Sequence, residues 1–140
     1  KVTGVQTCAL PIYLEGDSVI RQFAMVLHSA KRTYDTVARL GGDEFAWLLM
    51  DADPDQALHA AGRAHRLVNE SVFEVAGKPM KVTATFGVSS LLPGMELSVD
   101  DLVGNADRAL YWGKESGRNT VRFYPPRKAE RDAETDPHLS

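Results

Sequence analysis

The sequence is poor in two features that would each define a class of protein, cysteine and long apolar runs. Its one cysteine, Cys8, permits no internal disulfide and suits a reducing compartment. No apolar stretch approaches the roughly 18 residues that a membrane-spanning helix needs. The N-terminus also lacks the charged, apolar and small-residue pattern of a secretory signal. We therefore expect a cytoplasmic chain.

The sequence also has no excess of positive charge, because its 16 lysines and arginines are fewer than its 19 aspartates and glutamates, for a net charge of −3. Binding to duplex nucleic acid relies on a basic field, and this balance does not supply one. We expect no nucleic-acid partner. The chain has 140 residues, of which 44% are hydrophobic and 25% charged, and this is the composition of one globular domain.

The two ends of the chain differ from its middle. Residues 2–12, "VTGVQTCALPI", show no periodicity that continues into the next residues of the chain, and this predicts an irregular segment. They resemble the conceptual translation of a common sequencing-library adapter. We expect residues 1–12 to be a non-native or disordered leader and the domain to span 13–125. The charged residues 126–140 are predicted to form a tail or linker.

Apolar spacing in the first half of the domain predicts a helix and a hairpin. Apolar residues recur at three- and four-residue intervals over 19–27, which indicates a helix beginning near Asp17 or Ser18, and either residue can cap it. The runs "TVARL" (36–40) and "EFAWLLM" (44–50) predict two strands joined by a glycine-rich tip. The second run is apolar on both faces, so we expect an interior strand.

The second half predicts two more helices and further strands. The first helix is capped by Asp53 and begins with Pro54, and it is followed by a strand near Phe73 and a turn at 77–79. The next strand has Val82, Ala84, Phe86 and Val88 on one face. The last two elements are a helix from the "SVDD" at 98–101 to about Lys114 and a strand at 120–124. The pattern predicts an α+β fold, an antiparallel-rich sheet flanked by helices. We expect one strand and one helix of this fold to be missing at its front.

Adjacent carboxylates at the hairpin tip carry the most chemical information. Asp43 and Glu44 cannot both enter an apolar core without a large desolvation cost, so at least one should face solvent or a cation. Oxygen ligands beside a glycine turn suit Mg²⁺, and Gly41 and Gly42 let a large ligand approach the backbone. The alternative is that the glycines and Asp43 simply form the turn and Glu44 is a solvated strand position.

"RLGGDEF" resembles the signature of the GGDEF family of diguanylate cyclases. The resemblance continues in order through "GDSVIRQFAMVL", "YDTVARLGGDEFAWLL", "VTATFGVSSL" and "ADRALYWGKESGRNTVRFY", about residues 14–124. It implies a nucleotidyl-cyclase, palm-like fold that joins two GTP molecules into cyclic di-GMP across a homodimer, with Mg²⁺ (or Mn²⁺). It also implies that Asp43 is a metal ligand and general base, that Glu44 completes this site, and that Gly41 and Gly42 leave room for nucleotide.

The resemblance extends to three further binding residues. Asp17 matches the aspartate that reads guanine, although the residues themselves favour a helix cap. Lys114 and Arg118 match the pair that contacts the triphosphate. The compact ammonium of a lysine and the planar guanidinium of an arginine both suit binding to phosphate oxygens. The alternative for that pair is a lysine favoured at a helix C-terminus and a solvated arginine.

Arg32 and Asp35 form an Arg-x-x-Asp pattern separated from Gly41 by residues 36–40. In the family this place often holds an inhibitory site for cyclic di-GMP. The alternative is an exposed arginine near an aspartate at a helix end.

Three other residues are interpreted as structural. His65 is expected to be a half-buried helix residue rather than a metal ligand, and Trp47 and Trp112 are expected to be core or interface aromatics.

The sequence departs from the family pattern at its front. The family's first strand carries another metal-binding aspartate, and the following segment carries an asparagine that contacts guanine; neither is found here. Tyr13 stands where the family usually has histidine, and Ile12 where it has glycine. We therefore expect little cyclase activity from this polypeptide.

The tail is similar to the linker that often joins a GGDEF domain to an EAL phosphodiesterase domain. This similarity predicts a fragment of a larger signalling protein that is coupled to a sensor or a membrane. A regulatory module that binds GTP or cyclic di-GMP, and an inert dimerisation domain, are the competing hypotheses.

Overall fold

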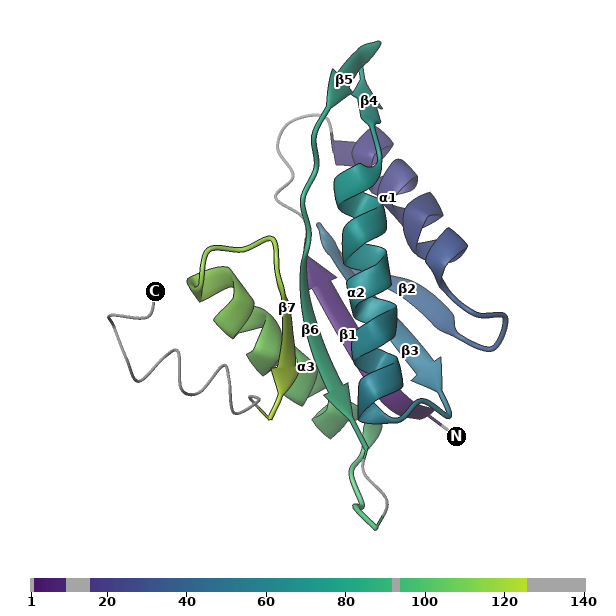
Figure 1. Ribbon diagram of the computed structural model, residues 1–140, viewed down its shortest axis with the longest axis vertical. Helices are drawn as coiled ribbons and strands as arrows, with labels where there is room; N and C mark the ends of the chain where they lie inside the picture. Colours follow the sequence, from purple (N-terminus) through teal and green to yellow (C-terminus); the bar gives the residue numbers. More distant parts are fainter. Residues whose placement is uncertain (1, 10–15, 92–93, 126–140) are drawn as a thin grey trace.

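A central sheet with helices on both faces organises the chain (Figure 1). The computed structural model describes residues 2–9, 16–91 and 94–125. The helices are α1 (Gly16–Ala30), α2 (Pro54–Glu70) and α3 (Val99–Glu115). The strands are β1 (Val2–Ala9), β2 (Thr36–Gly41), β3 (Glu44–Met50), β4 (Phe73–Val75), β5 (Lys78–Met80), β6 (Thr85–Ser90) and β7 (Val121–Tyr124). The predicted tail at 126–140 lies outside the described residues, as do residue 1 and residues 10–12 of the predicted leader.

The five-stranded sheet has the order β2-β3-β1-β6-β7, and only the β6–β7 pair is parallel. The predicted antiparallel-rich sheet flanked by helices is therefore confirmed. Strand β3 lies between β2 and β1, as its two apolar faces predict. Strands β4 and β5 form a separate hairpin at one end of the molecule (Figure 1).

The prediction of an irregular segment at residues 2–9 was wrong, because Val2–Ala9 form β1 in the middle of the sheet. Thr7 is paired with Ala46 of β3 on one side and with Gly87 of β6 on the other. Without β1, the facing edges of β3 and β6 would carry unpaired backbone N–H and C=O groups. Pairing through the main chain needs only an extended segment. Residues 2–9 therefore form a strand although their apolar and polar side chains do not alternate, and this strand occupies the place of the one that we predicted to be missing.

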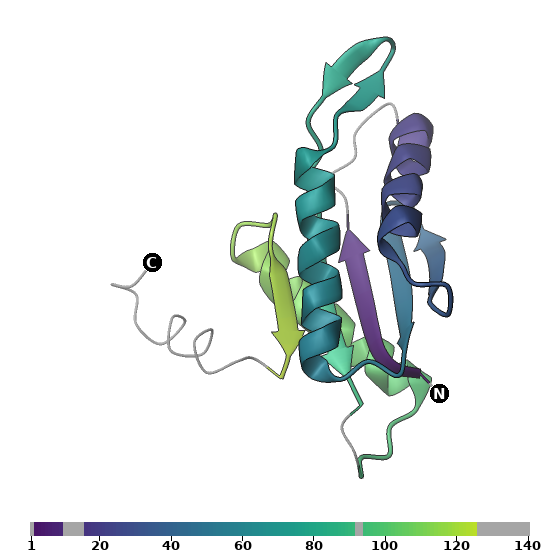
Figure 2. The same ribbon diagram turned by 45° about the vertical axis from the view of Figure 1, so that its right-hand side comes forward.

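The two faces of the sheet are covered by different helices. On one face α1 and α2 pack against Phe45, Trp47 and Leu49 of β3, and the rings of Phe23 and Phe45 lie 5.1 Å apart. On the other face α3 packs against Leu48. Figure 2 shows α1 and α2 in front of the sheet and α3 behind it. Successive strand residues point to opposite faces, which explains why β3 is apolar throughout.

Side chains cap the N-termini of α2 and α3, as the sequence predicts. Asp53 forms a capping box with Gln56 at the start of α2, and Ser98 forms one with Asp101 at the start of α3. Helix α1 begins at Gly16, so Asp17 lies in its first turn and not at the predicted cap. None of the described helices has the length and apolar character that spanning a bilayer requires.

Strand β6 is shorter than predicted and more completely buried. It begins at Thr85 instead of near Val82, and all six of its residues are buried. The reason is that α2 covers one face and α3 the other. The approach of α3 is close, because a Cβ placed on Gly87 would lie 2.1 Å from the carbonyl oxygen of Ala106. A glycine is therefore required at this point of contact.

Candidate active site

The predicted hairpin tip is confirmed, since β2 ends at Gly41 and β3 begins at Glu44. Gly42 has φ of +51°, in the left-handed region that favours glycine. Arg39 closes the turn from the side by donating from Nε to the carbonyl oxygen of Gly42 at 2.9 Å. Asp43 and Glu44 are half-buried. The turn therefore presents two carboxylates beside an open backbone.

Lys114 reaches this turn from the last turn of α3. Its Nζ lies 3.8 Å from Oε1 of Glu44, and the two side chains are 30% and 46% exposed. The sequence separates these residues by the whole of α2, β6 and most of α3. The fold thus brings together two of the predicted site residues, an acid of the turn and a base of the helix end.

Arg118 follows Lys114 on a tight turn that leads into β7. Its backbone N–H donates to the carbonyl oxygen of Gly113 at 2.9 Å, which folds the chain back over the end of α3. Gly117, Arg118 and Asn119 all have positive φ, of +106°, +62° and +50°. The Arg118 side chain is exposed. Lys114 and Arg118 are therefore both presented from the end of α3, and their role in binding stays a prediction.

Asp17 is exposed in the first turn of α1. Its described interaction is through the backbone, since its carbonyl oxygen lies 3.4 Å from Nε of Arg21. No contact recorded for the described part of the chain joins Asp17 to the Gly41–Gly42 turn. Its assignment as the residue that reads guanine stays a prediction.

Arg32 and Asp35 lie at the opposite end of β2 from the glycine turn. Asp35 is only 4% exposed, and it accepts hydrogen bonds from the backbone and side chain of Arg32, from Nε1 of Trp47 at 3.2 Å and from the backbone N–H of Met50 at 3.4 Å. Arg32 also donates to the carbonyl oxygen of Met50 at 2.7 Å. Arg32 and Asp35 therefore connect the start of β2 to the end of β3.

The electrostatic setting of Asp35 follows from these contacts. Burial alone would raise the pKa of Asp35. The hydrogen bonds from Arg32 and Trp47 and the positive charge of Arg32 outweigh burial and hold that pKa below its usual value. Asp35 is therefore a charged carboxylate inside the domain at neutral pH.

The residues of the turn suit a hard divalent cation. No hydrogen bond or ion pair is recorded for the Asp43 carboxylate within the described residues, and the Glu44 carboxylate is paired there with Lys114. Two such carboxylates fit Mg²⁺, which is commonly bound by one or two carboxylates together with phosphate oxygens and water. Strand β1, which is paired with Glu44 through Ala9, contains neither aspartate nor glutamate. In residues 2–9, 16–91 and 94–125, no three metal-ligating side chains gather.

The three residues interpreted as structural lie in structural positions. Trp47 is buried in the core, and Trp112 stacks on Tyr124 with the ring centres 5.8 Å apart. His65 is half-buried on α2 and lies edge-on to Phe86. The predictions that Trp47 is a core residue and that His65 is a half-buried helix residue are confirmed.

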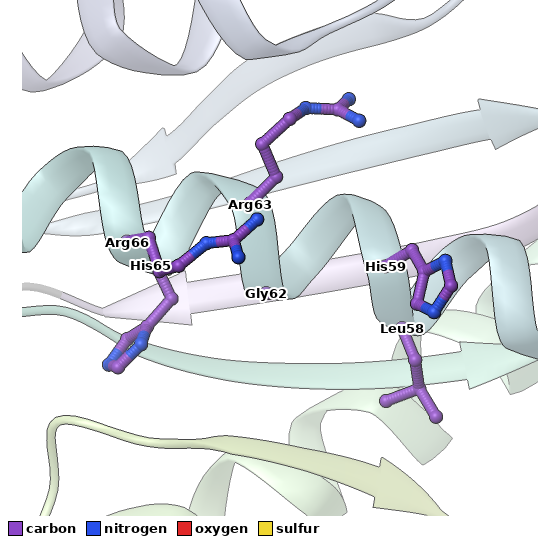
Figure 3. A pocket seen from close by; sticks show the side chains of 6 residues that line it. All are labelled: Leu58, His59, Gly62, Arg63, His65 and Arg66. Atoms are coloured by element: carbon purple, nitrogen blue, oxygen red, sulfur yellow. The ribbon is translucent and has the colours of Figure 1, made fainter.

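Sequence reasoning missed a basic hollow on the outer side of α2. It has a volume of about 640 Å³ and is lined by Leu58, His59, Gly62, Arg63, His65 and Arg66 (Figure 3). Arg63 donates to the carbonyl oxygen of Ala30 at 2.7 Å and so closes the end of α1. The spacing of His59, Arg63 and Arg66 on one helix face would have indicated this surface.

The sheet, the glycine turn with its two acids, and the basic residues at the end of α3 belong to an α+β domain with an antiparallel-rich sheet flanked by helices. Comparison with known families identifies it further. Residues 13–120 match the family described as diguanylate cyclase, GGDEF domain, and the chain belongs to that family.

Relatives of known sequence support the same assignment. The chain is 39% identical over 111 residues to the diguanylate cyclase DgcZ of Escherichia coli, covering 79% of this chain and 37% of the relative. It is 40% identical over 108 residues to the response regulator PleD of Caulobacter vibrioides, covering 76% and 24%. The chain thus spans less than two-fifths of the length of these relatives.

Solved structures agree with the fold. The GGDEF domain of TpbB (YfiN) from Pseudomonas aeruginosa superimposes with a TM-score of 0.78 at 26% identity, covering 95% of this chain and 81% of the other. The active GGEEF domain of a diguanylate cyclase from Vibrio cholerae has the same TM-score at 24% identity, covering 91% and 85%, which is evidence for the fold alone.

Proposed function

We propose that this domain binds GTP with Mg²⁺ (or Mn²⁺) and contributes to the condensation of two GTP molecules into cyclic di-GMP. The observation that carries the proposal is the 3.8 Å approach of the Lys114 ammonium to the Glu44 carboxylate. It joins the acidic turn to the helix end that also presents Arg118. A triphosphate with a divalent ion needs both kinds of group within one site, acids for the ion and bases for the phosphates.

Each residue has a distinct role in the proposal. Lys114 and Arg118 bind the triphosphate as a point charge and a planar fork. The open backbone at Gly41 and Gly42 lets the nucleotide approach the turn. Asp43 is the metal ligand and general base, and Glu44 completes the acidic site while Lys114 neutralises part of its charge.

The proposed reaction is a displacement at phosphorus. The 3′-hydroxyl oxygen of one GTP bonds to the α-phosphorus of the other, the α–β anhydride bond breaks, and pyrophosphate leaves. Asp43 receives the hydroxyl proton. A second, equivalent step closes the ring. When bound, the divalent ion supplies charge neutralisation at the phosphate oxygens. The chain's own contribution is to hold the phosphates and accept the proton.

The chemistry requires two nucleotides, and each domain is proposed to hold one. A homodimer of GGDEF domains that face one another then supplies the second GTP. Asp17 is proposed to select guanine, because a carboxylate can accept hydrogen bonds from the base N1 and N2 donors. Its exposure in the first turn of α1 leaves it accessible for that role.

The chain as it stands is proposed to be a poor cyclase. Strand β1 pairs with the strand that carries Glu44 but brings no acidic residue to the turn. Among the residues that the structure describes, Asp43 and Glu44 are then the carboxylates proposed to bind the metal, and each lost charged ligand weakens binding of a hard cation.

Arg32 is proposed to take part in product inhibition together with Asp35. The Arg32 side chain is 43% exposed although it holds Asp35, so part of the guanidinium is available to a phosphate of cyclic di-GMP. The buried Asp35 would orient that guanidinium. The site would act on the turn at a distance, because the two lie at opposite ends of β2.

A regulatory module for an attached phosphodiesterase is the alternative function, and the absence of acids from β1 favours it. The chain is 31% identical over 109 residues to the bifunctional diguanylate cyclase/cyclic di-GMP phosphodiesterase MucR of Pseudomonas aeruginosa, covering 78% of this chain and 16% of the relative. We propose that residues 126–140 form a linker toward an EAL domain. The parent protein would be cytoplasmic or the cytoplasmic part of a membrane-bound sensor.

Binding of GTP to the purified chain, measured by calorimetry with and without Mg²⁺, tests the proposal. We expect Mg²⁺-dependent binding that Asp43→Asn weakens by about tenfold, which corresponds to about 1.4 kcal/mol. Asp107→Asn, an exposed change on α3, is the matched control and should bind as the unmodified chain does. A dissociation constant for GTP that changes neither with Mg²⁺ nor with Asp43→Asn would contradict the proposed site.

Activity separates the two functions. In a parent gene with its upstream and downstream segments restored, cyclic di-GMP synthesis that Asp43→Ala abolishes supports the cyclase. Unchanged synthesis, or none in either form, supports the regulatory module. An inert dimerisation domain would bind no nucleotide at all.

A further inference from the structure

The turn that carries Arg118 has an unfavourable backbone conformation. Arg118 and Asn119 follow Gly117 with φ of +62° and +50°, so two successive non-glycine residues are in the left-handed region. Such residues cost free energy and persist where surrounding contacts determine the conformation. The contacts that hold this turn therefore decide where the Arg118 side chain is presented.

Backbone contacts hold the two ends of the turn. The N–H of Arg118 donates to Gly113 at 2.9 Å, and the N–H of Phe86 donates to the carbonyl oxygen of Thr120 at 2.9 Å. The N–H of Asn119 donates to Oγ1 of Thr85 at 3.0 Å. These bonds fasten the turn to α3 and β6, but none of them engages the Asn119 side chain.

His65 of α2 contacts the side chain of Asn119. Its Nε2 lies 2.8 Å from Oδ1 of Asn119 and 3.5 Å from Nδ2 of Asn69. An amide oxygen only accepts, so the shorter contact is a hydrogen bond in the tautomer that carries its proton on Nε2. The ring lies at 86° to Phe86 with centroids 6.1 Å apart, which fixes its direction. In Figure 3 the His65 side chain leaves α2 toward β6 and the segment before β7, whereas Arg63 points to the opposite side.

We propose that His65 is a positioning residue for Arg118. By holding the side chain of Asn119, it keeps the left-handed turn formed and so presents Arg118 to the triphosphate. The inference rests on the proposed role of Arg118 in binding GTP. His65 itself is proposed to touch neither nucleotide nor metal. Its contact with Oδ1 of Asn119 depends on a hydrogen-bond donor at the position of Nε2.

The test compares His65→Ala and His65→Gln with the full unmodified chain. Glutamine can place an N–H near the position of Nε2, whereas alanine cannot. His59→Ala, an exposed change on the same helix, is the control. Two quantities are measured at conditions where every variant is folded: backbone amide hydrogen exchange at Arg118 and Asn119, and the dissociation constant for GTP with Mg²⁺.

We expect His65→Ala to speed exchange at both amides and to weaken GTP binding by about fivefold to tenfold. His65→Gln should restore both within about twofold, and His59→Ala should change neither. Unchanged exchange in His65→Ala would overturn the proposal. Equal losses in His65→Ala and His65→Gln would also overturn it, because they would assign the effect to ring packing on Phe86.

The outcome for the proposed function can be read separately. If the unmodified chain binds no GTP, the proposed function fails, and the exchange measurement still decides whether His65 holds the turn. If GTP binds but His65→Ala binds it equally well, the proposed function stands and the positioning role fails.

Discussion

The ammonium of Lys114 and the carboxylate of Glu44 lie 3.8 Å apart, which joins the end of α3 to the start of β3. Both side chains are partly exposed, so the pair contributes little to stability. We expect Lys114→Met to change the free energy of unfolding by less than about 1 kcal/mol and to weaken GTP binding by about tenfold. Urea denaturation and calorimetry measure the two effects.

Lys81→Met provides the control for that change, because it removes an equal charge from an exposed position outside the site. It should leave GTP binding unaltered. A Lys114→Met variant that unfolds readily but binds GTP normally would make Lys114 a structural residue.

The stability of the domain should depend on the charge of Asp35. Its folded-state pKa is lowered, so its contribution is present above the unfolded-state pKa and is lost as pH falls through the folded value. Asp35→Asn should destabilise the domain by about 2 kcal/mol at pH 7, because an NH2 group replaces one of the oxygens that accept hydrogen bonds from Arg32, Trp47 and Met50. The difference from the unmodified chain should shrink below about pH 4.

Unfolding in urea at a series of pH values measures this dependence. Asp107→Asn, which removes an exposed carboxylate, should follow the unmodified chain throughout. A difference between Asp35→Asn and the unmodified chain that stays constant down to pH 2 would show that the Asp35 charge is not the cause.

Two glycines in contrasting surroundings should respond oppositely to alanine. A Cβ on Gly87 would meet the carbonyl oxygen of Ala106 at 2.1 Å, so Gly87→Ala must push α3 from the sheet and should cost about 3 kcal/mol. A Cβ on Gly62 of α2 meets nothing within 4 Å, so Gly62→Ala should stabilise by about 1 kcal/mol. Thermal unfolding of the two variants compares them directly.

The importance of β1 can be tested at its centre. Thr7 is paired with both Ala46 and Gly87, and proline there removes a ladder donor from an interior strand. We expect Thr7→Pro to lose most of the folded population by circular dichroism, while Thr7→Val keeps it. Folding that is indifferent to proline would mean that the sheet does not depend on this strand.

Local sequence signals predicted the elements well where one physical preference dominated. Asp53 and Ser98 were identified as caps because their side chains satisfy free N–H groups of the adjoining helix, an interaction within a few residues. The hairpin at Gly41 and Gly42 was identified for the same kind of reason. The start of β6 was misplaced by three residues, because alternation over Val82 and Ala84 reflects burial and not strand pairing.

Residue type and spacing are enough to predict the helices, the glycine turn with its two acids, and the family to which the chain belongs. That Val2–Ala9 complete the sheet is seen only in the folded chain, because backbone pairing does not depend on the side-chain pattern from which strands are predicted. Only the folded chain likewise shows that Lys114 meets Glu44 and that His65 meets Asn119. Such contacts depend on how helices pack across a sheet, a long-range choice governed by the burial of apolar faces.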